Sequence, residues 1–184
     1  MGCSQAKIEL EALTPDDARI IRETWKMVGR EAYGEYGQRL MLRIFQKCPD
    51  IKSLWQNPRV TNNANAAATT TAAAVGDDTD APNTANRWKM DLRNHGSKFF
   101  NSLDDLISVV DKPDELFKML HDIGSQHHNY EVKSEHIQAI VDGLNHTMEF
   151  GLRDKWTDNR QKSFGRLINI IVTRTNRALT GNEK

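Results

Sequence analysis

Apolar residues recur every three or four positions through most of this chain, and this spacing limits the folds that the chain can adopt. One series contains a histidine in its middle: Trp88, Leu92, His95, Phe99, Leu103 and Leu106. A second series ends at another histidine: Leu116, Leu120, Ile123 and His127. This spacing places each series on one face of a helix. Both imidazoles are therefore expected to point where core side chains point.

The same spacing predicts further helices. Thr14 is the expected N-cap of a helix with Pro15 at its first position, while Ser134 and Thr157 are expected to begin two later helices. The apolar residues of these and one intervening helix are Ile21, Trp25, Val28, Leu40, Ile44, Phe45, Ile137, Ile140, Val141, Leu144, Met148, Phe164, Leu167, Ile168 and Ile171. Strand-like alternation is absent from the sequence. The chain is therefore predicted to be all-α, with six or more helices.

Two stretches interrupt the helical pattern. Cys48 and Pro49 are expected to end one helix, and residues 50–55 are expected to form a short turn. Residues 57–86 are rich in Asn, Ala and Thr and contain almost no large apolar residue. Such a segment buries too little surface to offset its ordering entropy. It is predicted to be a disordered low-complexity insertion.

Composition excludes several classes of function. The 184 residues suffice for one domain, and 25 basic residues balance 25 acidic ones, so charge gives no reason to expect a nucleic-acid partner. No run approaches the ~20 apolar residues of a membrane span. The two cysteines, Cys3 and Cys48, suggest no disulfide framework and favour a reducing, cytosolic setting. Cys48 is expected to be a buried structural residue, with a redox thiol as the alternative.

The two inward histidines are the main candidates for a functional site. Histidine is a common metal ligand, so two imidazoles aimed between helices are suited to binding a ligand there. A single inward histidine is more often a core residue with a satisfied hydrogen bond. The pattern alone leaves both interpretations open, and no nucleophile triad, zinc cluster or phosphate loop indicates other chemistry.

Several short motifs, in their order and spacing, resemble the globin family. They are Leu13-Thr14 with Trp25, Ile44 to Ile51, Asn94-His95-Gly96, Leu120 to His127 with Val132-Lys133, and Lys155-Trp156-Thr157. The resemblance implies a globin fold, a 3-over-3 helical sandwich, with the low-complexity loop between the family's C and E helices. The globin domain would span residues 13–179, with a flexible start at 1–12 and a flexible tail at 180–184.

The resemblance assigns roles to the two histidines. His127 would be the proximal ligand of the iron of haem b, with its other ring nitrogen donating to a backbone carbonyl. His95 would be the distal residue, either a gate for ligands or itself a sixth iron ligand. Their separation of 32 residues is similar to that in neuroglobin-like members. His128 is the competing proximal residue, but it is rotated by about 100° from the apolar face.

The resemblance also assigns haem contacts to six positions: Met41, Trp55, Lys98, Phe99, Ile123 and Val132. Met41 and Phe99 would narrow the distal side, while Ile123 and Val132 would form the proximal floor and corner. Lys98 would reach a haem propionate, unless it is a solvated surface lysine. Trp55 stands where the family usually has a phenylalanine.

A haem protein that binds oxygen or another diatomic gas is the function that the resemblance implies. The neuroglobin-like spacing favours a six-coordinate, bis-histidine haem, which suits oxygen or redox sensing and requires an electron donor. The alternatives are a redox catalyst that produces superoxide or converts nitric oxide or nitrite, and a plain oxygen carrier. A haem-free interaction module is disfavoured because both histidines are present.

The first residues, Met1-Gly2-Cys3-Ser4, resemble the start of dually acylated proteins. Gly2 would accept myristate and Cys3 palmitate, although Ala6 stands where serine or threonine is preferred. Two lipid chains together hold a protein on a membrane. This predicts the cytoplasmic face of the plasma membrane, with an ordinary N-terminus in the cytoplasm as the alternative.

Overall fold

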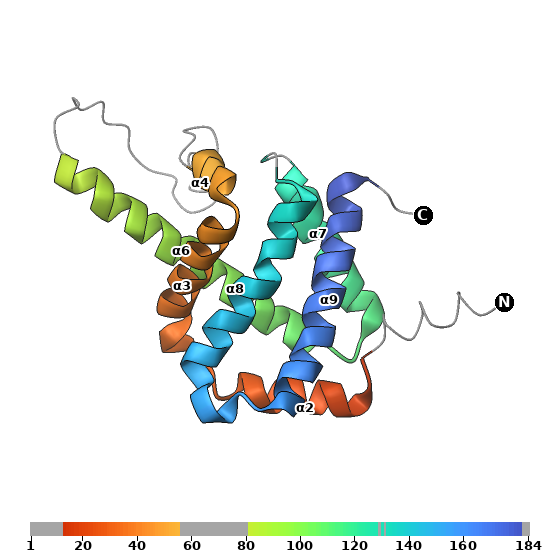
Figure 1. Cartoon of the computed structure of the whole chain (residues 1–184). Coiled ribbons are helices and arrows are strands. Elements are labelled where there is room, and N and C mark those ends of the chain that lie inside the picture. The colour runs from red at the N-terminus through yellow and green to blue at the C-terminus, as the bar shows by residue number, and fades with distance from the viewer. Residues whose placement is uncertain (1–12, 56–80, 129, 131, 182–184) are drawn as a thin grey trace, which may run out of the picture.

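The computed structural model describes residues 13–55, 81–128, 130 and 132–181 (Figure 1). Within these residues the chain forms α-helices and two short 3-10 helices. No described residue lies in a β-strand, as predicted. The α-helices are α2 (Pro15–Trp25), α3 (Tyr33–Lys47), α4 (Pro49–Trp55), α6 (Ala81–Ser108), α7 (Pro113–His128), α8 (Ser134–Leu152) and α9 (Asp158–Thr180). In this part of the chain no helix is both long and apolar enough to cross a membrane.

The helices pack in two layers around one apolar core. In Figure 1, α8 and α9 run side by side in front of α6 and α7. Helix α3 crosses α6 and also packs on α8, while α2 contacts both α6 and α9. Each of the longer α-helices therefore packs on at least one partner that is distant in sequence, while α4 packs mainly on α3. Each of these α-helices thus depends on tertiary packing of its apolar face.

Most residues of the predicted apolar stripes form the core, but Phe100, which was not predicted, is fully buried, whereas Phe99 and Trp88 are only partly buried. Among the described residues, the largest fully buried side chains are Phe100, Phe164, Ile21, Leu40, Leu92, Leu103, Leu116, Leu120, Leu144, Met148, Leu167 and Ile168. The predicted helix starts are also confirmed: Thr14 caps α2, α8 begins at Ser134, and Thr157 is the N-cap of α9. Local signals in the sequence therefore located three helix ends correctly.

Two boundaries differ from the predictions. Residues 50–55 are helical as part of α4 and do not form the predicted turn, because Pro49 opens this helix instead of closing a bend. Helix α6 already begins at Ala81, inside the predicted insertion 57–86. Pro82 falls in its first turn, where the missing N–H costs no intrahelical bond. The rest of the predicted insertion, up to residue 80, lies outside the described residues.

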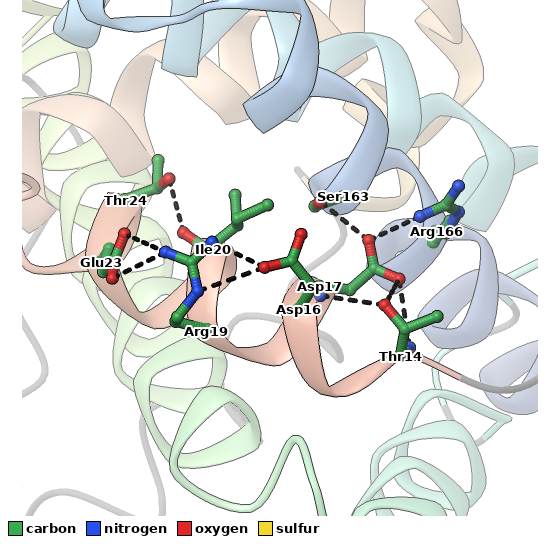
Figure 2. Close-up of polar contacts among 9 residues, drawn as sticks. All are labelled: Thr14, Asp16, Asp17, Arg19, Ile20, Glu23, Thr24, Ser163 and Arg166. Carbon is green, nitrogen blue, oxygen red and sulfur yellow. Dashed lines mark hydrogen bonds and ion pairs between the residues drawn. The ribbon is translucent and has the colours of Figure 1, made fainter.

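A buried carboxylate joins the start of α2 to α9 (Figure 2). Thr14 caps the backbone N–H of Asp17 at 3.1 Å, and the Thr14 hydroxyl donates to Asp17 Oδ2 at 2.7 Å. Ser163 Oγ and Arg166 Nη1 of α9 donate to Asp17 Oδ1 at 2.8 and 2.6 Å. Burial raises the pKa of Asp17, but hydrogen bonds from Thr14, Ser163 and Arg166 outweigh it and hold the pKa below 3.8.

We expect Asp17→Asn to lower the free energy of unfolding at pH 7 by about 2 kcal/mol, because it removes a charge on which buried donors converge. Since the folded-state pKa is lowered, the contribution of Asp17 is present above pH 4 and is lost as the pH falls through the folded pKa. Urea unfolding at pH 7 and pH 3 measures both effects, and the difference between wild type and variant should shrink at pH 3.

Asp16→Asn is the matched control. Asp16 is the preceding residue in the same turn, and its exposed side chain pairs with Arg19 on the surface. Exposed ion pairs contribute little to stability. An equal loss in the two variants would show that the buried network has no special role.

Candidate functional site

The close crossing of α3 and α6 places the first histidine of the candidate site. A Cβ atom added to Gly96 would lie 2.3 Å from the carbonyl carbon of Gly37, and one added to Gly37 would lie 2.2 Å from that of Gly96. No side chain fits at either position, so the two backbones are in direct contact. Because His95 precedes Gly96, the position of its backbone along α6 is fixed by this crossing.

His95 on α6 lies near His127 on α7. The pKa of His95 is lowered from 6.5 to about 4, first by burial and then by the charges of His127 and Lys98. The electrostatic effect of His127 means that the two imidazoles, one on α6 and one on α7, lie close to each other. His95 nevertheless keeps some exposed surface. The structure therefore brings the two predicted histidines together from different helices.

His127 is held in one tautomer by its own helix. Its Nδ1 lies 2.8 Å from the carbonyl oxygen of Ile123, one turn earlier in α7. A carbonyl only accepts, so Nδ1 carries the proton and donates it. Nε2 then keeps its lone pair, which is the state that a metal-ligating histidine requires.

The neighbouring His128 faces a different helix. Its Nδ1 lies 2.9 Å from the carbonyl oxygen of Leu179 near the end of α9. This contact turns the His128 ring toward α9, whereas His127 interacts with His95 on α6. Of the two adjacent histidines, only His127 shares a face with the candidate site.

Four of the apolar residues that the resemblance assigns to haem contacts lie in the core or pack against it. Met41 of α3 is buried, but Phe99 of α6, Ile123 of α7 and Val132 before α8 pack against the core with part of their surface exposed. Apolar side chains that the protein covers only partly are suited to contact with a flat, mostly apolar ligand. Together with the free Nε2 of His127, these residues fit the haem that the sequence resemblance implies.

For the remaining predicted site residues, the structure gives less information on their position relative to the two histidines. Lys98 is an exposed residue whose charge contributes to the lowered pKa of His95, so it lies near the histidine pair. Trp55 ends α4, but its side chain lies outside the described part of the structure. Gly2 and Cys3 also lie outside the described residues.

A second cluster, which the sequence did not predict, joins α4 to the start of α8. Asp50, Glu135 and His136 bring possible metal-ligating atoms within 4.8 Å of one another. His136 Nδ1 accepts from the backbone N–H of Lys133 at 3.1 Å, so its proton is on Nε2, which donates to Asp50 Oδ2 at 2.8 Å. A metal at Nε2 would have to displace this proton. The arrangement fits a hydrogen-bonded tie between the two helices better than a metal site.

Cys48 lies beside this tie. Its Sγ is 3.9 Å from the carbonyl oxygen of Glu135, and burial, Asp50 and Glu135 raise the pKa of the thiol. The side chain is half-buried rather than fully buried. A raised pKa keeps the thiol protonated and unreactive, which agrees with a structural role.

We expect Gly96→Ala to lower the free energy of unfolding by about 1–3 kcal/mol, because overpacking moves α6 away from α3. Gly165→Ala in α9 is the control, since a Cβ there meets nothing within 4 Å and alanine favours the helix. Urea unfolding of both variants separates the close crossing from a general effect of glycine replacement. Equal stability changes of the same sign would contradict the importance of the crossing.

Comparison with known proteins gives two findings. Residues 77–175, more than half of the chain, match the family model described as Globin. Among solved structures, the fold is similar to the crystal structure of a hexacoordinated haem protein from an anhydrobiotic tardigrade at pH 4, with a TM-score of 0.67 and 17% identity. That match covers 92% of this chain and 97% of the other. No curated protein sequence matches the chain.

Proposed function

The chain belongs to the globin family, as its motifs predicted, and we propose that it binds haem between His127 and His95 in a six-coordinate, bis-histidine state. The observation that carries this proposal is the hydrogen bond from His127 Nδ1 to the Ile123 carbonyl, which leaves the lone pair on Nε2 of a histidine that lies near His95. When bound, haem supplies an iron that binds diatomic ligands and exchanges single electrons.

His127 is the proposed proximal ligand. The Ile123 carbonyl fixes the proton on Nδ1 and limits rotation of the ring, so Nε2 is presented in one orientation. The hydrogen bond also increases the basicity of Nε2, because partial negative charge develops on the ring when Nδ1–H donates. His128 is excluded from this role because its ring is engaged with α9.

His95 is the proposed sixth ligand. The Gly37–Gly96 contact fixes its position on α6, and burial keeps its ring neutral at neutral pH. A neutral imidazole has a lone pair to offer, whereas a protonated one does not. Met41 and Phe99 reduce the room around the distal side, so an external ligand has to compete with His95 for the same place.

We propose that this globin acts in oxygen or redox sensing at a membrane and receives electrons from a separate donor. A bis-histidine state needs little rearrangement when the iron changes its oxidation state, so it suits electron exchange better than bulk oxygen storage. The sequence Met1-Gly2-Cys3 supports a lipid anchor on Gly2 and Cys3. Localisation at a membrane favours signalling, because storage requires abundance in the bulk cytosol.

We expect the ferrous, ligand-free protein to have a low-spin absorption spectrum. His95→Leu should convert it to a high-spin spectrum and accelerate carbon monoxide binding at least tenfold, because the external ligand no longer competes with His95. Optical spectra with dithionite and stopped-flow mixing measure the two effects. A high-spin spectrum of the wild type would overturn the six-coordinate proposal and favour a simple oxygen carrier.

Two histidine variants serve as controls for this experiment. His127→Gly should lose the proximal ligand and regain a haem spectrum when free imidazole is added. His128→Gln should keep the wild-type spectrum, since His128 contacts α9. If His128→Gln, rather than His127→Gly, abolished the spectrum, the two adjacent histidines would have to exchange roles.

We expect Gly2→Ala to move the protein from the membrane to the soluble fraction of eukaryotic cells, because alanine at this position cannot accept myristate. Cys3→Ser should give a partial release, since one myristoyl chain binds membranes only marginally. Fractionation followed by immunoblotting measures the distribution. Membrane association that persists in Gly2→Ala would contradict the proposed lipid anchor.

A further inference from the structure

Gly124 of α7 lies where no side chain fits. A Cβ atom added there would lie 2.5 Å from the carbonyl oxygen of Thr175 and 2.7 Å from the Cβ of Ala178, both on α9. Alanine is favoured over glycine inside a helix by about 1 kcal/mol, so a glycine within a helix usually has a packing reason. Here the reason is close contact, since Gly124 is buried where α7 packs on α9. The backbone of α7 therefore lies directly on α9.

Contacts on both sides of Gly124 hold the same two helices together. Toward the start of α7, the guanidinium carbon of Arg174 lies 3.8 Å from the centre of the Phe117 ring. At the end of α7, His128 Nδ1 donates to the carbonyl oxygen of Leu179 at 2.9 Å. Helix α7 therefore contacts α9 along most of its length.

His127 projects from the neighbouring face of α7. It follows Gly124 by three residues, so its Cβ is rotated by about 60° from the direction that faces α9. Its ring does not swing freely, because Nδ1 donates to the Ile123 carbonyl of the same helix. A displacement of α7 from α9 therefore carries His127 Nε2 with it, instead of being absorbed by rotation of the side chain.

We propose that Gly124 is a positioning residue for the bond between His127 and the haem iron, because the missing side chain sets how close α7 lies to α9. The inference rests on the proposed haem site and on His127 as its proximal ligand, but not on His95 as the sixth ligand. It makes α9 a determinant of the iron–Nε2 bond that acts through α7.

The test introduces Gly124→Ala into the His95→Leu variant, in which His127 is the only proposed protein ligand of the iron. Alanine forces α7 away from α9, so the bond from Nε2 is expected to form under strain. Resonance Raman spectra of the ferrous protein should show the iron–Nε2 stretching band at a lower frequency than in His95→Leu alone. Haem transfer to an excess of an apo-globin acceptor should be about tenfold faster, or ~1.4 kcal/mol, which lies within the cost of overpacking.

A second experiment separates the position of His127 from a general effect of the added methyl group. In the same His95→Leu background, His127→Gly is supplied with just enough free imidazole to restore the haem spectrum, and this ligand has no bond to α7. Adding Gly124→Ala should then leave the iron–imidazole band where it was. A shift as large as the one seen with His127 would overturn the inference, because it would act without the helix.

Two matched variants control for the substitution and for lost stability. Gly165→Ala adds the same methyl group to α9 where nothing lies within 4 Å, so the band and the rate of haem release should not change. Asp17→Asn weakens the contact between α2 and α9 and should lower stability without moving the band. An equal shift in Asp17→Asn would attribute the effect of Gly124→Ala to destabilisation, and would also overturn the inference.

A further variant is available if Gly124→Ala does not fold. Ala178→Val enlarges the other side of the same contact, at a side chain that is only partly buried, and should shift the band in the same direction. An unmoved band in the folded variants would contradict this inference alone. If His95→Leu by itself shows no iron–Nε2 band, the proposed haem site fails instead, so the two failures are distinguishable.

Discussion

Direct contact between the backbones of α3 and α6 is the constraint on which the rest of this molecule depends. With no side chain between Gly37 and Gly96, the two helices approach as closely as a pair of helices can. The contact fixes where His95 lies along α6, near His127 of α7. A protein interior is close-packed and transmits such a constraint over several residues. The position of His95 in the histidine pair therefore depends on two glycines, Gly37 and Gly96.

Most of the fold could be predicted from the spacing of apolar residues alone. The stripes on α2, α8 and α9 were identified correctly, because each has a clear N-terminal signal and a long amphipathic run. The errors concern α4 and the start of α6, each of which has a proline in its first turn. Proline both ends and begins helices, so only the surrounding packing decides between the two.

The candidate site could be predicted only in part. His95 and His127 were found because each interrupts an apolar stripe, and the carbonyl partner expected for His127 is the one that any helix provides four residues earlier. The tie between His136 and Asp50 was not found, because it joins residues 86 positions apart. Long-range polar pairing leaves no local pattern in a sequence.

The tie between α4 and α8 has a consequence for how this chain can change over evolutionary time. Asp50 and His136 hold α4 in place, and the crossing at Gly96 holds α6, so the helices on either side of residues 56–80 are each fastened by contacts with the core. Contacts with the core therefore fix the end of α4 and the start of α6. They do not fix the number of residues that join the two helices. Doubling the length of a connection adds only about 0.6 kcal/mol of closure entropy. We therefore expect a change in the number of residues between α4 and α6 to leave the positions of these two helices on the core unchanged.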